Sequence, residues 1–179
     1  EAANFSAGGS IDLSETYASD PATGTYPYAV MLISKDFNIK GKFGPVGGKT
    51  YYSTSTFQTS STDSGDYATT EAPLNTFGGP GSCEAYTEGE VVTDGVISAY
   101  LIDSSGIMLE SDSSLSECSG QEKLLGVMNM SSDLTISDAT EGLKMTFTVT
   151  NNGMSVVTNE TGTDIFVDSG PFSVKFETF

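Results

Sequence analysis

Alternation of apolar and polar residues with a period of two is the feature that most restricts how this 179-residue chain can fold. Residues 143–149 set Leu143, Met145, Phe147 and Val149 against lysine and threonine, and residues 172–179 repeat the alternation. Successive side chains of a β-strand point to opposite faces, so this pattern predicts half-buried strands. No segment has convincing helical periodicity. The sequence therefore predicts an all-β protein.

Other segments predict strands and turns with more specific environments. Residues 28–33 are a continuous apolar run, typical of a strand buried on both faces. Residues 123–130 fit either a strand or a short helix. The sequence Asn151-Asn152-Gly153 separates two apolar runs, 143–149 and 154–158, and predicts a hairpin between them. Residues 103–106 predict a short hairpin connection after a strand at 96–102.

About nine or ten short strands separated by turn signals favour a single β-sandwich of immunoglobulin-like or jelly-roll type. We expect one sandwich domain over residues 17–179 and an extended N-terminal arm over residues 1–16. Two segments rich in serine, glycine and acidic residues, near 60–89 and 111–121, are expected to be long polar excursions on the surface.

The two cysteines, Cys83 and Cys118, each lie in one of these polar segments. Unpaired cysteine prefers burial, so its occurrence in polar loops favours a disulfide between the two residues. A disulfide would place the protein in an oxidising compartment such as the periplasm or the cell exterior. We expect an exported protein from which a signal peptide has already been removed.

The charge of the chain excludes several functions. Seven basic residues, all lysines, stand against 24 acidic residues, for a net charge of −17, and histidine is absent. Nucleic-acid binding needs a basic surface, so no nucleic-acid partner is expected. The longest apolar run is too short to span a bilayer, so no direct membrane insertion is expected. Four lysines lie between residues 35 and 49 and none between 50 and 122. Solvated faces are the default explanation of this charge distribution, but it would also let one end of a molecule attract the other end of an identical neighbour.

The acidic residues do not form a recognisable catalytic or metal-binding motif. The acidic turns at Asp63 and Asp66 and at Asp112 and Glu117 lack the ligand spacing of an EF-hand, so solvated turn residues are the favoured explanation. Paired carboxylates can hydrolyse glycosides, but tryptophan, a common sugar platform, is absent. We expect no enzymatic activity, no cofactor and no metal.

The N-terminal segment has the pattern of an inserted β-strand. Its apolar residues fall on one face around a central glycine: Phe5, Ala7, Gly9, Ile11 and Leu13. An arm of this kind can complete an incomplete sandwich by filling successive pockets with alternate side chains while its backbone pairs with a sheet edge. The alternative is an ordinary first strand that lies beside the last strand of its own domain.

This pattern at Phe5, Gly9 and Ile11 resembles the N-terminal extensions of chaperone–usher pilins. The final segment, 172–179, is similar to their C-terminal strand, and residues 5–14 resemble more loosely the subunits of TasA-type matrix filaments. The resemblance implies a subunit of a pilus or filament on the cell surface, assembled from identical subunits by donor-strand complementation. A periplasmic chaperone and an assembly machinery are the further partners that it implies. Two other functions fit the sequence: a monomeric cell-surface module that binds carbohydrate or a host surface, and a viral capsid or tail protein.

Overall fold

The computed structural model describes residues 22–179 except 79–80, 93, 149–153, 159–164 and 170–172. The chain is all-β with antiparallel pairing throughout, so the predicted sandwich class is confirmed. The described strands are β1 (Gly24–Ser34), β2 (Asn38–Ile39), β3 (Lys42–Val46), β4 (Lys49–Ser53), β5 (Ser60–Ser61), β6 (Thr70–Glu71), β7 (Tyr86–Val92), β8 (Gly95–Ile102), β9 (Lys123–Ile136), β10 (Leu143–Thr148), β11 (Met154–Thr158), β12 (Ile165–Ser169) and β13 (Ser173–Thr178). One short 3-10 helix, η1 (Ser64–Asp66), lies between β5 and β6.

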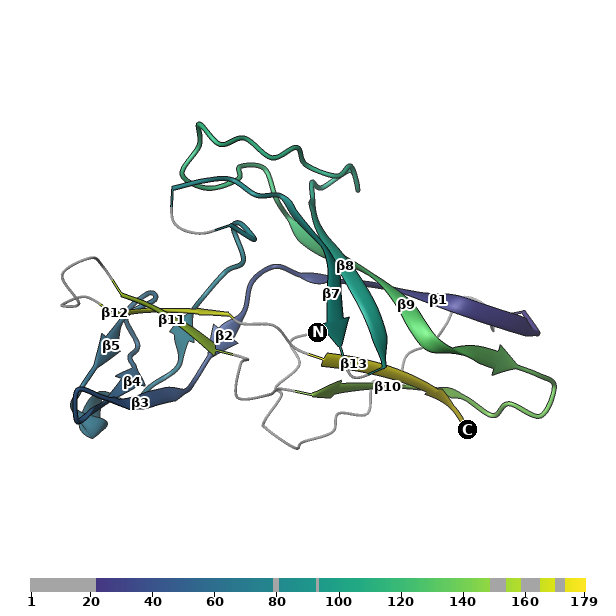
Figure 1. The fold of residues 1–179 in the computed structure, drawn as a ribbon, viewed down its shortest axis with the longest axis horizontal. Coiled ribbons are helices and arrows are strands. Elements are labelled where there is room, and N and C mark those ends of the chain that lie inside the picture. The colour runs from purple at the N-terminus through teal and green to yellow at the C-terminus, as the bar shows by residue number, and fades with distance from the viewer. Residues whose placement is uncertain (1–21, 79–80, 93, 149–153, 159–164, 170–172) are drawn as a thin grey trace.

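The largest sheet has four strands in the order β1-β9-β8-β7. It occupies one end of the longest axis of the molecule, and the three-stranded sheet β3-β4-β5 lies at the other end beside the β11–β12 pair (Figure 1). The β10–β13 pair runs next to the large sheet, where β13 contacts β9. A short β2–β6 pair lies between the two ends.

The core lies on one face of the large sheet, called here the inner face. Leu101 of β8 and Leu124 of β9 are buried there together with Ala85. Further along the same face, Met31 and Met128 are also buried. Gly126 faces Met31 across the β1–β9 pair, where an added Cβ atom would come within 3.1 Å of the Met31 methyl group. Alternate residues of β1, β8 and β9 therefore build the core, as the period of two requires.

The predicted disulfide is present and forms part of this core. The Cys83 and Cys118 sulfur atoms are bonded, and both residues are almost completely buried against Leu101 and Leu124. Their polar sequence neighbours suggested exposed loops, but backbone hydrogen bonds tie the two segments to each other over the core. The Cys118 N–H donates to the Asn75 carbonyl, and Cys83 exchanges backbone hydrogen bonds with Asp112.

The two polar segments are therefore only partly surface structure. Residues 60–89 contain β5, β6 and the start of β7, and they bring Thr70, Ala72 and Ala85 to buried positions. In residues 111–121 the buried member is Cys118. The excursions fold back and cover one end of the inner face.

One predicted pairing is wrong. The sequence predicted that residues 143–149 and 154–158 form a hairpin, but β10 pairs with β13, and β11 pairs with β12. In the β10–β13 register Phe147 faces Val174 and Met145 faces Phe176, so apolar residues meet across the two strands. The Asn-Gly pair indicates only a local preference for a turn. The apolar match between β10 and β13 joins segments that are far apart in the sequence, so the local pattern could not predict it.

The buried Ser53 of β4 links its strand to the segments that contain Gly41 and Ala68, near the three-stranded sheet β3-β4-β5. Ser53 is 1% exposed, its Oγ donates to the Ala68 carbonyl at 2.6 Å, and it accepts from the Gly41 N–H at 3.1 Å. We expect Ser53→Ala to lower the free energy of unfolding by about 1–3 kcal/mol, because both backbone groups would lose their partner. Urea unfolding would measure this loss. The exposed Ser55 gives the control, since Ser55→Ala should leave the midpoint unchanged; equal midpoints for both variants would contradict the role of Ser53.

Candidate self-association surface

The second face of the large sheet is apolar and exposed. We call it the outer face. It is formed by Tyr28, Val30 and Leu32 of β1, Leu125 and Val127 of β9, Val96 and Tyr100 of β8, and Tyr86 and Val91 of β7.

The strand register places these side chains in continuous rows. Leu32 faces Leu125, which faces Tyr100, which in turn faces Tyr86. A second row runs from Val30 to Val127 and on to Ser98. Directly opposite residues of antiparallel strands lie about 4.5–5.5 Å apart and so form one contiguous surface.

Much of this surface is accessible to solvent. Val30 is 65% exposed and Val91 is 84% exposed, whereas Leu101 on the inner face is 0% exposed. Four strands about 4.8 Å apart, each contributing five residues at about 3.3 Å per residue, give the outer face a projected area of roughly 300 Å². Contiguous apolar patches of roughly 300–600 Å² on a monomer are often functional, typically as interaction sites. The outer face is therefore a candidate contact surface.

This exposure corrects a sequence prediction. Residues 28–33 were predicted to be buried on both faces, but only the alternate residues Ala29, Met31 and Ile33 point to the inner face. Tyr28, Val30 and Leu32 are more than half exposed. The apolar run was the correct signal for two apolar faces, and it could not indicate that one of them lacks a covering layer within the same chain.

The rest of the outer face was not recognised in the sequence. Tyr86 and Val91 lie in β7, whose first residues fell within the predicted excursion near 60–89. A signal was present, because Tyr86 and Val91 are apolar residues shortly before the strand predicted at 96–102, which begins with Val96. Glycine and glutamate between these residues, together with the β-bulge between Thr87 and Glu90, break the period of two.

A carboxylate lies at the β7 edge of the outer face. Glu88 accepts a hydrogen bond from the Tyr100 hydroxyl at 3.0 Å. This hydrogen bond, followed by partial burial, raises the pKa of Tyr100 above its ordinary value, because the carboxylate favours the protonated phenol. The Tyr86 and Tyr100 rings stack with centroids 6.2 Å apart, so the apolar rows end in an aromatic pair beside a negative charge.

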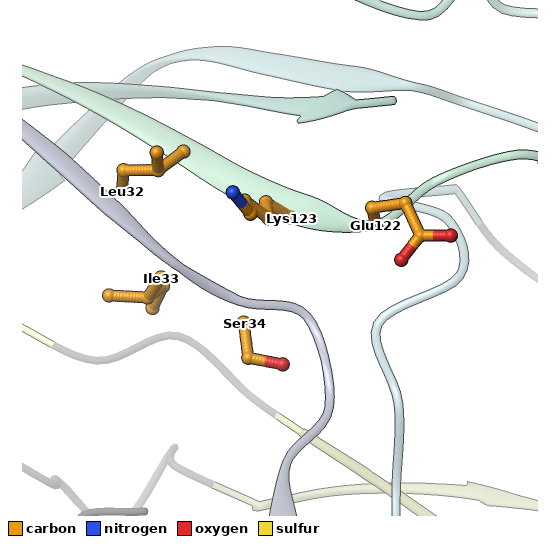
Figure 2. A pocket seen from close by; sticks show the side chains of 5 residues that line it. All are labelled: Leu32, Ile33, Ser34, Glu122 and Lys123. Atoms are coloured by element: carbon orange, nitrogen blue, oxygen red, sulfur yellow. The ribbon is translucent and has the colours of Figure 1, made fainter. Parts of the chain in front are cut away.

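Strand β1 forms the opposite edge of the same sheet. Among the described residues β1 pairs only with β9. At its end a shallow hollow of about 240 Å³ is lined by Leu32, Ile33, Ser34, Glu122 and Lys123 (Figure 2). Leu32 and Ile33 point to opposite sides of β1, and the charged ends of Glu122 and Lys123 point away from each other (Figure 2). The hollow is smaller than usual ligand pockets of roughly 300–1,000 Å³. We therefore interpret it as the end of an apolar strand edge.

The acidic turns of the sequence serve as local caps. Asp63 accepts from the Gly65 N–H and caps η1. Asp112 accepts from both the backbone and the hydroxyl of Ser114, and these hydrogen bonds lower the pKa of Asp112 below its usual range. In the part of the chain that the structure describes, no three cysteine, aspartate or glutamate side chains gather as a metal site would require.

The predicted donor residues Phe5, Ala7, Gly9, Ile11 and Leu13 lie outside the described residues, as does the whole predicted arm. Their role stays a prediction. The C-terminal strand predicted at residues 172–179 is present as β13, in which Val174 is buried. Within the described ranges, no helix is long and apolar enough to cross a membrane.

The comparisons with known proteins give no relative for this arrangement. No protein-family model matches the chain, and neither the curated proteins nor the solved structures contain a match.

Proposed function

We propose that this protein is an extracellular structural protein, a subunit of a cell-surface filament that assembles from identical copies. The observation that carries the proposal is the exposed outer face, because most of its side chains are apolar, Ser98 and Asn129 being the exceptions within its rows, and no layer covers it among the described residues. A second chain that covers this face would remove from water the apolar surface that a single copy leaves exposed.

The donor strand of the proposal is the N-terminal arm. An extended segment paired along the edge of β1 would place every second side chain beside Ala29, Met31 and Ile33, where the inner-face core reaches the edge of the sheet. Phe5, Ala7, Ile11 and Leu13 have that spacing, and Gly9 suits a point where the acceptor backbone comes close. Burial would contribute about 1.5–3 kcal/mol for each of the three large side chains, and ordering the backbone would oppose it by about 1–2 kcal/mol per residue. Main-chain hydrogen bonds to the sheet edge are therefore required as well.

The disulfide is compatible with the extracellular or periplasmic setting of such a subunit. Because β1 would present an exposed apolar face and a free strand edge before assembly, a periplasmic chaperone and an assembly machinery are natural further partners. The proposal includes no enzymatic step and no cofactor.

A monomeric binding module is the second candidate. The observation that favours it is the Tyr86–Tyr100 pair beside Glu88, since aromatic rings next to a carboxylate can hold the apolar face and the hydroxyl groups of a sugar. A module of this kind would stay monomeric at all concentrations, and a capsid protein would form closed shells. Electron microscopy would distinguish monomers and closed shells from the fibres that the filament proposal predicts.

The arm provides the decisive test of the filament proposal. We expect the full-length chain to form fibres visible by electron microscopy, and we expect Gly9→Leu and Ile11→Asp each to reduce the sedimentable fraction at least tenfold. Leucine at position 9 would collide with a close acceptor backbone, and aspartate at position 11 would place an unpaired charge in an apolar site.

The matched control is Ser10→Asp, which adds the same charge on the polar side of the arm. It should assemble like the parent, and circular dichroism should show that all variants remain folded. Assembly of Gly9→Leu and Ile11→Asp at the level of the parent would exclude strand donation by the arm.

A further inference from the structure

The tip of the β3–β4 hairpin is a second exposed apolar surface, far from the first. Phe43 is 44% exposed and Val46 is 45% exposed. In the register of the hairpin Val46 faces Lys49 and Phe43 faces Tyr51, so Phe43, Val46 and Lys49 share one face. Every residue of β3 is exposed, which leaves this tip without a layer over it.

The tip is also the basic region of an acidic protein. Lys42 and Lys49 are exposed at the tip. The ion pairs within the described ranges join Lys35 to Asp36 and Lys175 to Glu177, so neither tip lysine has a carboxylate partner there. The tip therefore combines apolar contact area with unneutralised positive charge.

The outer face has the complementary character. Its β7 edge carries Glu88, and no lysine occurs in the sequence between residues 50 and 122. Glu88 is not ion-paired to a lysine of the described chain. The hairpin tip lies at one end of the longest axis of the molecule, whereas β7, the edge of the large sheet that carries Glu88, lies near the middle of that axis (Figure 1).

From this placement we infer that the hairpin tip of one copy docks on the outer face of the next copy. Phe43 and Val46 cover the apolar rows near Tyr86 and Tyr100, and Lys49 lies against Glu88. With a net charge of −17, most other contacts between two copies would bring like charges together, so the lysine-bearing tip is the favoured partner for the acidic edge.

The size and symmetry of this contact suit a filament. The two surfaces differ, so the contact is heterologous, and it propagates from copy to copy in one direction unless its rotation closes a ring. The outer face, at roughly 300 Å², is too small for a stable complex that needs about 800 Å² per partner. The hairpin contact therefore acts together with the arm, which would lie along the β1 edge, and in this respect the inference rests on the proposed function.

Charge reversal tests the contact in the full-length chain. Lys49→Glu alone and Glu88→Lys alone should each raise the critical concentration for fibre formation about tenfold, because each sets like charges against each other. An equal mixture of the two variants should assemble like the parent, since every contact then joins opposite charges. The double variant Lys49→Glu/Glu88→Lys should recover assembly for the same reason.

The exposed Lys144 of β10 gives the matched control, and Lys144→Glu should leave the critical concentration unchanged. If the parent forms fibres and Lys49→Glu assembles equally well, or if mixing restores nothing, the hairpin contact is wrong while the filament proposal stands. If the parent forms no fibres at any concentration or salt, both the filament proposal and the hairpin contact are wrong.

Discussion

Replacing both cysteines by alanine should lower the melting temperature by roughly 8–16 °C, the largest change in stability expected for this protein. The disulfide closes a loop with a sequence separation of 35 residues, for which the chain-entropy model gives about 4 kcal/mol. Both sulfur atoms also lie in the core beside Leu101 and Leu124, so their removal leaves space in the inner face.

Reduction of the parent provides the internal control for this experiment. Dithiothreitol should lower the melting temperature of the parent toward that of Cys83→Ala/Cys118→Ala and should leave the variant unaffected. Differential scanning calorimetry in both buffers measures the four values. A double variant that melts within 2–3 °C of the oxidised parent, where roughly 2–4 °C corresponds to 1 kcal/mol, would show that the bond contributes little.

Gly95→Ala should lower the free energy of unfolding by about 3 kcal/mol or more, the second largest effect. Gly95 begins β8 with a φ of +152°, a conformation nearly restricted to glycine. An added Cβ atom would also collide with the Asn129 carbonyl oxygen of β9 and lie 3.0 Å from the Met130 Cα atom. Both atoms belong to the backbone of the neighbouring strand, so the sheet itself would have to move.

Gly106 provides a comparison that isolates the close approach. It has a φ of +82° in the turn after β8, and an added Cβ atom there would meet no atom within 4 Å. Gly106→Ala should therefore cost only the backbone strain of about 1–2 kcal/mol. Urea denaturation of both variants measures the difference, and equal losses would mean that contact with β9 is unimportant.

The all-β class and the disulfide could be predicted because both depend on local properties of the sequence. Alternation at residues 143–149 and 172–179 follows directly from strand geometry, and both segments contain strands. Cys83 and Cys118 had one available partner each. These predictions did not require knowledge of which segments meet in space.

Predictions that depended on distant partners were less successful. Residues 123–130 were ambiguous in isolation, and their strand state is fixed by pairing with β1 on one side and β8 on the other. The hairpin expected at Asn152 and Gly153 is replaced by the β10–β13 and β11–β12 pairs. Local turn preferences of this kind are weaker than a register that matches apolar residues across two distant strands.

The candidate surface shows the same limit. Apolar residues on both faces of β1 could be read from the sequence, but the exposure of Tyr28, Val30 and Leu32 depends on what the rest of the chain covers. The tip of the β3–β4 hairpin was visible only as a group of lysines, without its place at one end of the molecule.

The pairing of β1 with β9 has a consequence for the newly made chain. Tyr28 meets Asn129, so about a hundred residues must be synthesised after β1 before its partner strand exists. At roughly 5–20 residues per second, this leaves β1 unpaired for about 5–20 s. During that delay both of its apolar faces and both of its edges can pair with another unfinished chain. Aggregation during synthesis therefore affects the yield of folded protein independently of its final stability, because β1 stays unpaired until β9 has been made.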